Sequence, residues 1–485
     1  MSPKPTHPYT IARRNLLRGT TGVVLGGLLD SIAFSQESLG NSTSNASEAS
    51  LIADPIAKVL QPFVDAEQMP GFVTIVANKE QILQTSVVGW ADVEAKRPMR
   101  EDTLFWIASM SKTFCAVAVM MLVDEKKLTL DDPITKFFPE FSQLKVATPQ
   151  ENGDVRLVPP TTIPTVRQVL SHTAGWSFKT PYMLRFGNDS LPLERKIQTF
   201  ANTPLESQPG TKYQYSNIGI DCAAAIVEKV SDQKYEDFLQ QRIWTPLGMT
   251  QTTYCPTEER LATNYALPYR WNAEQNKLER TTIYALNYPL SQPEGRFADA
   301  GGGIFSTAGD VTKFYQMLLR HGEYDGKQLL SPESVNEISR KQTGDAVSNS
   351  YGLAASVSKR SFGHGGAYAT DGLVYPQDDY VTIYMVQVTG VPKQNEAKKA
   401  FDQATYQMVL QQAAANLPTI TDLRPDAERW NLPRRAQGTR GTCSVFALVG
   451  AVEWTVGRMD DKTEHLSIDF ANWAKNHGGK DRFAG

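Results

Sequence analysis

The chain has 485 residues, of which 41% are hydrophobic and 21% charged, and its formal net charge is −3 at pH 7. This composition is typical of soluble globular proteins, and the small net charge gives no electrostatic reason to expect a nucleic-acid partner. The four cysteines form no CxxC pair and the six histidines form no HExxH pattern, so we expect neither a metal nor another cofactor. The length predicts one large domain with smaller segments beside it.

Residues 1–35 are predicted to be a targeting segment. Two adjacent arginines in RRNLLR (13–18) precede a modest apolar run over 23–29, and small residues follow at 33–35. This order resembles a twin-arginine signal, which would direct the protein to the periplasm or the extracellular space. The alternatives are an ordinary secretory signal and a disordered basic tail. The apolar run is too short to span a bilayer as a stable helix. The Ser- and Asn-rich residues 36–50 are predicted to be a flexible spacer.

The next elements are a helix, a hairpin and a second helix. Apolar residues at helical spacing predict an amphipathic helix over 51–67. Two runs rich in β-branched residues, over 71–80 and 81–93, predict a hairpin that turns at Asn78-Lys79-Glu80. WIASMSKTFCAVAVMMLV (106–123) then predicts a buried helix, and the stretch from about 125 to 300 alternates loop signals with short helical patches.

Thr307-Ala308-Gly309-Asp310 predicts a capping box that opens a helix through Leu319. Strand-like patterns then return before a last helix, which is predicted over 396–414. The class is therefore α+β: an antiparallel sheet flanked by N- and C-terminal helices, with a large, mostly helical insertion between the first two strands and the last ones. This domain is expected to cover residues 51–416. The late strand-like runs are 351–357, 360–366, 370–376 and 379–388, with a turn at 376–379.

Ser109 and Lys112 lie at positions i and i+3 of the predicted buried helix, so their side chains share one face. A serine at a helix N-terminus favours a nearby oxyanion, and an amine beside it can accept a proton. S-x-x-K alone is weak, because a helix cap followed by an incidental lysine produces the same pattern.

Two further motifs accompany S-x-x-K. Tyr215-Ser216-Asn217 lies in KYQYSNIGIDCAAA, and His364-Gly365-Gly366 lies in RSFGHGGAYATDG. In this order the three motifs resemble the penicillin-recognising serine hydrolases: class C β-lactamases, D-Ala-D-Ala carboxypeptidases, D-aminopeptidases and related esterases. Three other stretches resemble the same family, namely LTLDDPITKFFPEF (128–141), VLSHTAGW (169–176) and AGGGIFSTAGDVTKF (300–314).

The resemblance implies a role for each motif residue. Ser109 would be the nucleophile, with Lys112 and Tyr215 as its base system. Asn217 would hold Lys112 and donate to a substrate carbonyl, although a turn asparagine is the alternative. The backbone N–H groups of Ser109 and Ala367 would form the oxyanion hole, and Gly366 would let the strand edge approach the substrate.

His364 departs from the lysine that many β-lactamases and transpeptidases have at this position. Histidine attracts a carboxylate less than lysine does, so we expect ester cleavage to exceed lactam cleavage. His172 is expected to be structural, hydrogen-bonded near a helix end. Cys115 and Cys222 are expected in the core. The glycines 301–303 are expected to form a tight turn near the pocket.

The C-terminal part carries a second resemblance. A Pro- and Asp-rich linker (417–430) precedes LPRRAQGTRGTCSVFALVGAVEW, in which Gln437 and Cys443 resemble the oxyanion glutamine and the nucleophile of papain-like cysteine peptidases. Arg440 and Ser444 depart from that pattern, and the histidine expected roughly 130–150 residues after the cysteine does not follow in this sequence. We therefore expect 431–485 to be a truncated, inactive fragment; a structural helix that docks on the main domain is the alternative.

The resemblance implies an exported serine hydrolase that forms an acyl-enzyme on esters or small amides, like esterases, D-aminopeptidases or carboxypeptidases, with at most weak β-lactamase activity. Its substrate would be a small ester, amide or peptidoglycan-like molecule, and no membrane span is expected in the mature chain. The alternative is a non-catalytic descendant that binds peptidoglycan-like ligands or partners. The sequence does not indicate an oligomeric state.

Overall fold

The computed structural model of the protein describes residues 54–345 and 347–415. The predicted signal segment (1–35), spacer (36–50), linker (417–430) and papain-like fragment (431–485, with Gln437 and Cys443) lie outside these residues. No helix in the described part of the chain is long and apolar enough to cross a membrane.

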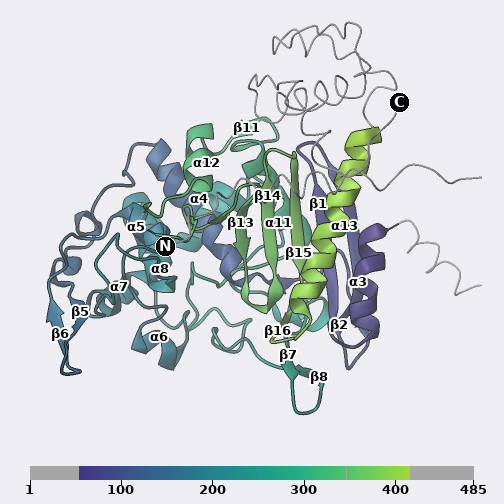
Figure 1. Ribbon diagram of the computed structural model, residues 1–485, viewed down its shortest axis with the longest axis horizontal. Helices are drawn as coiled ribbons and strands as arrows, with labels where there is room; N and C mark the ends of the chain where they lie inside the picture. Colours follow the sequence, from purple (N-terminus) through teal and green to yellow (C-terminus); the bar gives the residue numbers. More distant parts are fainter. Residues whose placement is uncertain (1–53, 346, 416–485) are drawn as a thin grey trace, which may run out of the picture. The chain divides into compact units, whose positions relative to one another are not determined.

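A seven-stranded sheet forms the centre of the domain, with the strand order β12-β13-β14-β15-β1-β2-β3 (Figure 1). β1 (Gly71–Ala77) pairs antiparallel with both β2 (Ile82–Asp92) and β15 (Tyr380–Met385). All seven residues of β1 are buried, because strands flank it on both sides and helices cover both faces. The predicted pairing of the first strands with the last ones is confirmed. The other strands are β3 (Arg97–Pro98), β12 (Ser356–Val357), β13 (Phe362–Gly365) and β14 (Asp371–Tyr375).

Helices from the two ends of the domain cover one face of the sheet. α3 (Pro55–Asp65) and α13 (Gln394–Ala415) pack against each other, as Figure 1 shows. α3 lies within the predicted range of 51–67 but begins at Pro55, because the Asp54 carboxylate caps it by accepting hydrogen bonds from the backbone N–H groups of Ile56 and Ala57. The predicted terminal helices are confirmed.

α11 (Ala308–Leu319) covers the opposite face, over β1, β14 and β15. It begins at the predicted place, because the Thr307 hydroxyl accepts from the backbone N–H of Asp310 at 3.2 Å. Only this half of the predicted capping box is present. The Asp310 carboxylate instead accepts from the backbone N–H of Gln251 at 2.7 Å and from the Thr252 hydroxyl at 3.0 Å, which ties the helix start to a neighbouring loop.

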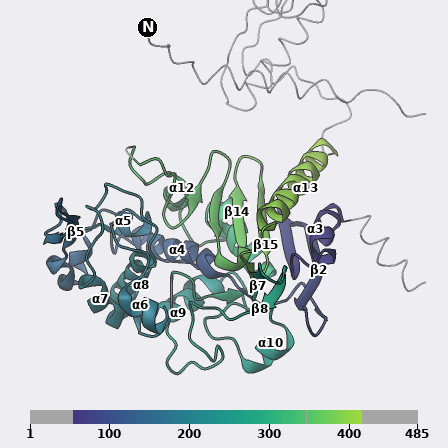
Figure 2. The ribbon, with the colours of Figure 1, turned by 60° about the horizontal axis from the view of Figure 1, so that its bottom comes forward.

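The insertion lies beside the sheet and is largely helical, as predicted (Figure 2). It begins after the short strand β4 (Phe105–Trp106), which pairs with β9 (Phe305–Ser306) where the chain returns. The helices between them are α4 (Ser111–Asp124), α5 (Val166–Leu170), α6 (Pro181–Phe186), α7 (Leu193–Ala201), α8 (Asn217–Ser231), α9 (Tyr235–Leu239) and α10 (Glu258–Thr263). The remaining strands and helix are β5 (Val146–Pro149), β6 (Val155–Val158), β7 (Tyr269–Asn272), β8 (Lys277–Arg280), β10 (Glu323–Tyr324), β11 (Lys327–Gln328), α12 (Pro332–Ser339) and β16 (Val388–Thr389).

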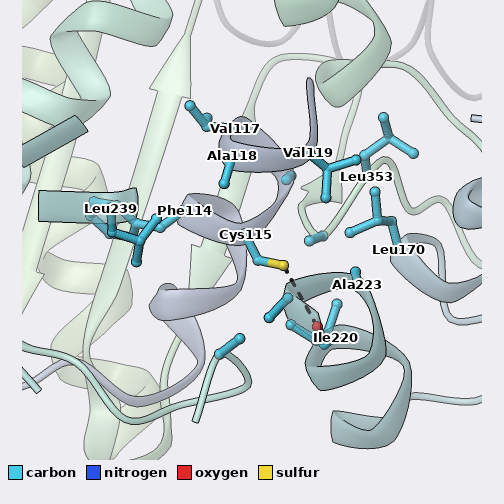
Figure 3. Close-up of a cluster of buried hydrophobic side chains, with 14 of the residues drawn as sticks. Phe114, Cys115, Val117, Ala118, Val119, Leu170, Ile220, Ala223, Leu239 and Leu353 are labelled. Atoms are coloured by element: carbon cyan, nitrogen blue, oxygen red, sulfur yellow. Dashed lines mark hydrogen bonds between the residues drawn. The ribbon is translucent and has the colours of Figure 1, made fainter. Parts of the chain in front are cut away.

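α4 is the central helix of the core, and twelve of its fourteen residues are buried. It packs on α8, and the Cys115 thiol lies between the two helices, 3.6 Å from the carbonyl oxygen of Ile220 (Figure 3). Burial raises the pKa of the Cys115 thiol to about 12 and raises that of Cys222 as well. Both cysteines are core residues, as expected.

Candidate active site

Ser109 lies on a tight turn between a strand and a helix. β4 ends at Trp106, the 3₁₀ turn η1 (Ala108–Met110) follows, and α4 begins at Ser111, so Ser109 just precedes the helix predicted to contain it. Ala108 has a φ of +48°, in a left-handed region that costs on the order of 1–3 kcal/mol. Such strain clusters at functional positions, and here it presents the Ser109 hydroxyl at the amino-terminal end of a buried helix.

Lys112 is fully buried, and polar groups surround its ammonium. Nζ lies 3.0 Å from the Ser109 hydroxyl oxygen and donates to the carbonyl oxygen of Gly301. It also lies 4.9 Å from the centre of the Tyr215 ring, at a cation–π distance. These contacts explain how an apolar helix accommodates a lysine, and they place an amine within proton-transfer distance of the serine.

The carbonyl oxygen of Gly301, and not the side chain of Asn217, accepts a hydrogen bond from Lys112. The side-chain oxygen of Asn217 is buried without a hydrogen-bond partner among the described residues, so the predicted contact from Asn217 to Lys112 is not seen. Gly301 packs directly on this amide, since a Cβ at 301 would lie 2.8 Å from the Asn217 side-chain carbon. The glycine therefore brings a carbonyl close to Lys112 where a larger residue would displace Asn217.

Tyr215 lies in the loop that leads into α8. Ser216 caps this helix, and its hydroxyl also donates to the carbonyl oxygen of Ser177 at 2.7 Å. The Tyr215 ring stacks on Phe178, with ring centres 5.8 Å apart. Within the described residues its hydroxyl is at hydrogen-bonding distance only from His364 Nε2, at 3.5 Å. The ring thus lies beside Lys112 while the hydroxyl faces the third motif.

A directional chain of hydrogen bonds connects the two histidines of the site. The backbone N–H of Ser216 donates to His172 Nδ1 at 3.2 Å, which leaves the hydrogen of a neutral ring on Nε2. His172 Nε2 then donates to the Tyr351 hydroxyl at 3.2 Å, and Tyr351 donates to His364 Nε2 at 2.8 Å. His364 Nδ1 donates to the carbonyl of Gly365 at 2.5 Å. The chain assigns opposite tautomers to the two histidines.

Both histidines are held in the neutral form. Burial, with a further contribution from the Lys112 charge, lowers the pKa of His364 to about 3 and places that of His172 well below its usual value. The third motif therefore presents no positive charge at His364. The predicted structural position of His172 near a helix end is confirmed, because α5 ends two residues before it.

Gly366 and Ala367 follow β13 and lie beside the Ser109 turn. A Cβ on Gly366 would collide with the Ile107 carbonyl and the Thr370 hydroxyl, so only glycine lets this edge approach the turn. The Thr370 hydroxyl also donates to the Ile107 carbonyl at 3.0 Å, and Ala367 is exposed. The edge that carries Gly366 and Ala367 therefore packs directly against the turn that carries Ser109.

A buried polar network fixes the loop that contains Gly301. Lys196 of α7 donates to the Asp221 carboxylate of α8 at 2.8 Å, and both side chains are almost fully buried. The other Asp221 oxygen accepts from the backbone N–H of Ala300 at 2.9 Å, and Asp299 accepts from that of Gly301 at 3.1 Å. Burial raises the pKa of Asp221, while the Lys196 ammonium opposes that shift. This network sets the position of the carbonyl that holds Lys112.

The structure therefore brings Ser109, Lys112, Tyr215 and His364 into one site, with Gly366 and Ala367 beside it. The sequence analysis missed Gly301 as a partner of Lys112, and it missed Tyr351. It also missed the ion pair of Lys196 and Asp221. The signal was Asp221 itself, because a carboxylate in an apolar helix is rarely buried without a paired cation. Within 54–345 and 347–415, no cluster of three or more His, Cys, Asp or Glu side chains could hold a metal ion.

Residues 56–407 match the family model described as Beta-lactamase. Protein Rv1367c of Mycobacterium tuberculosis is 33% identical over 358 residues, which cover 67% of this chain and 87% of that protein. Esterase EstB of Burkholderia gladioli is 30% identical over 300 residues, which cover 56% of this chain and 71% of the esterase. Among solved structures, EstCE1, a hydrolase with promiscuous acyltransferase activity, superposes with a TM-score of 0.62 at 22% identity. The match covers 74% of this chain and all of that chain, and it supports the fold alone.

Proposed function

Because the chain belongs to the beta-lactamase family, we propose that it is a serine hydrolase that cleaves esters or small amides through an acyl-enzyme on Ser109. The observation that carries the proposal is the 3.0 Å contact between the Ser109 hydroxyl and the Lys112 amine, in a site that also contains Tyr215. A serine hydroxyl is a poor nucleophile unless a base lies within hydrogen-bond reach, and Lys112 lies at that distance; its ammonium must first lose a proton to act as this base.

The reaction proceeds in two steps. Ser109 Oγ attacks the substrate carbonyl carbon while its proton passes to the Lys112–Tyr215 pair, and the developing oxyanion accepts from the backbone N–H groups of Ser109 and Ala367. The same proton then moves to the departing alcohol or amine, which leaves the acyl group on Ser109. Water attacks this ester in the second step: one of its protons passes through the Lys112–Tyr215 pair to Ser109 Oγ as the acyl–oxygen bond breaks, and the acid is released.

Esters are proposed as better substrates than lactams or D-Ala-D-Ala peptides. The last two carry a carboxylate, which a lysine in the third motif would attract. His364 is neutral and engaged with Tyr351, so it provides no charge for this contact. The relative named Esterase EstB is consistent with this preference for esters.

The second candidate is a protein of the same fold that binds such ligands without cleaving them. One observation favours it: the Tyr215 hydroxyl faces His364 at 3.5 Å and makes no hydrogen bond to Ser109 or Lys112 within the described residues. In this case Ser109 would remain unmodified by substrates and by acylating probes.

The test compares the wild-type protein with Ser109→Ala and a control, Ser231→Ala, which removes a hydroxyl at the far end of α8. We expect the wild type and the control to hydrolyse p-nitrophenyl butyrate and to react with a fluorophosphonate probe at Ser109. Ser109→Ala should lose at least about 10³-fold in kcat/KM and all labelling. Nitrocefin should be cleaved more slowly than the ester. A wild type without labelling or turnover leaves the binding function as the answer.

We also propose that residues 1–35 export the protein by the twin-arginine route. The support is the arginine pair in RRNLLR before a short apolar run. Replacing Arg13 and Arg14 by lysine should leave the full-length chain in the cytoplasm, whereas the wild type should be found in the periplasmic or secreted fraction. Equal export of both would refute this route.

A further inference from the structure

A cleft of about 530 Å³ lies between the loop and helix at 178–187 and the segment at 284–287. Its walls are tied together, because the backbone N–H of Asn188 donates to the carbonyl of Ala285 at 3.1 Å. The Asp189 carboxylate also accepts from the backbone N–H of Asn287 at 3.0 Å. The cleft is therefore pre-formed, and its volume is in the range of sites for small organic ligands.

The cleft adjoins the candidate active site. Phe178 lines it and also stacks on the Tyr215 ring, and the Phe178 carbonyl accepts from the backbone N–H of Asn217 at 3.0 Å. Lys179, the next lining residue, has its pKa lowered mainly by burial and in part by the charge of Lys112. A molecule bound at Ser109 can thus extend past Tyr215 into this cleft.

The walls expose an unusual amount of apolar surface. Six of the twelve large hydrophobic side chains that are exposed in the described residues belong to 178–186 and 284–297. Four of them line the cleft: Phe178, Leu184, Phe186 and Tyr284. Scattered exposed apolar residues need no explanation, but a cluster beside a reactive site indicates a surface that binds apolar groups.

Two cations lie among these apolar side chains. Lys179 Nζ lies 5.7 Å from the centre of the Phe178 ring and 5.5 Å from that of Tyr284, and Arg185 lies 5.1 Å from that of Phe186. No Asp or Glu lines the cleft, and neither cation forms a salt bridge within the described part of the chain. The nearby Asp299 is engaged with Asn188 and Gly301. The charge of Asp299 opposes the larger effect of burial on the pKa of Lys179, but Asp299 forms no salt bridge with either cation within the described residues, so both cations can pair with a bound anion.

We propose that this cleft binds the distal part of an ester substrate that is both apolar and anionic. The apolar body would pack on the four side chains named above, and a carboxylate or similar anion would pair with Lys179 and Arg185. That the bound molecule is a substrate depends on the proposed hydrolase function. That the cleft binds an apolar anion does not depend on it. The anion would lie at Lys179 and Arg185 and not at His364, which is engaged with Tyr351.

The binding test uses two fluorescent probes, 8-anilinonaphthalene-1-sulfonate and N-phenyl-1-naphthylamine, which differ only in the sulfonate. They are titrated into the full-length wild type, Lys179→Met, Phe186→Ser and Lys58→Met. Lys58→Met makes the same charge change on α3, a helix that does not line the cleft. We expect the sulfonate probe to bind about tenfold more tightly than its neutral analogue.

Lys179→Met should remove most of this difference, Phe186→Ser should weaken both probes, and Lys58→Met should change neither. Equal affinity of the wild type for the two probes would overturn the proposal, as would an equal effect of the two lysine substitutions.

The kinetic test uses two pairs of esters, in which a carboxylate is added either to the acyl part or to the alcohol part. In at least one pair, Lys179→Met should lower the kcat/KM of the anionic ester, relative to that of the neutral ester, by about tenfold. If neither ratio changes although Ser109-dependent turnover is present, the cleft proposal fails and the hydrolase stands. If the wild type hydrolyses no ester but shows the expected probe binding, the hydrolase fails and the cleft stands.

Discussion

The ion pair between Lys196 and Asp221 provides a quantitative test of how the site is positioned. The two side chains are 3% and 0% exposed, and their charged atoms lie 2.8 Å apart. At this distance, and with an effective dielectric constant of about 20, the Coulomb attraction is about 6 kcal/mol, which the loss of hydration on burial largely offsets. Removing one partner leaves the other charge buried and unpaired, at a cost of about 3–5 kcal/mol.

Asp221→Asn should therefore lower the free energy of unfolding by about 3–5 kcal/mol, as measured by urea denaturation. Asparagine keeps an oxygen that can accept from the Ala300 backbone N–H, so the main loss is the charge opposite Lys196. The double variant Asp221→Asn/Lys196→Met removes both charges and should recover at least about 2 kcal/mol of that loss. Asp378→Asn, which breaks the exposed pair with Arg360, is the control and should cost about 1 kcal/mol or less.

Activity adds a second readout. Asp221 acts on the reaction only through the loop whose Gly301 carbonyl holds Lys112, so the single variant should lower kcat more than it raises KM. The double variant should regain part of kcat. An unfolding free energy of Asp221→Asn within about 1 kcal/mol of the wild type would refute the energetic argument, and so would additive losses in the double variant.

Three further predictions follow from the contacts around Lys112. Gly301→Ala places a methyl group against the side chain of Asn217 and should lower ester kcat by roughly 10²-fold, whereas Gly309→Ala, where an added Cβ meets nothing within 4 Å, should leave it unchanged. NMR of ¹⁵N-labelled protein should show His172 with its hydrogen on Nε2 and His364 with its hydrogen on Nδ1; the same tautomer in both would contradict the hydrogen-bond chain. Because both folded-state pKa values lie below the unfolded value near 6.5, the unfolded chain binds more protons as pH falls. The unfolding free energy should then decrease between about pH 6.5 and 4, by up to about 1.4 kcal/mol per pH unit for each histidine. Urea denaturation across this range should show a smaller slope for His172→Gln, and an unchanged slope would argue against a buried neutral histidine.

The elements that sequence reasoning located were those with local signals. The β-branched runs of β1 and β2, the turn at 376–379 and the Thr307 cap each lie within a few residues, so their patterns were readable. The first and last strands pair as predicted because each carries an apolar run that needs a partner in the same sheet. Ser109 and Lys112 are likewise one turn apart, and their contact follows from helical spacing.

The missed contacts join segments that are far apart in the chain. Lys112 and Gly301 are separated by 189 positions, and neither local pattern indicates that the Gly301 carbonyl accepts a hydrogen bond from the Lys112 ammonium. Tyr351 was part of a strand-like run, and its role as a bridge between two histidines depends on how β13 and α5 meet. Such contacts are set by the packing of the insertion against the sheet, which periodicity alone does not encode.

The buried charge of Lys112 accounts for several features of the site together. A positive charge in this low-dielectric position raises the cost of any second cation beside it, which is one reason why His172 and His364 stay neutral. A neutral His364 can then accept from Tyr351 instead of attracting a substrate carboxylate. The next cation, Lys179, lies half-buried in the adjoining cleft, where its own pKa is lowered mainly by burial and in part by Lys112. Burial is the largest cause of that shift and the Asp299 charge opposes it, so an anionic group bound there would further stabilise the Lys179 ammonium.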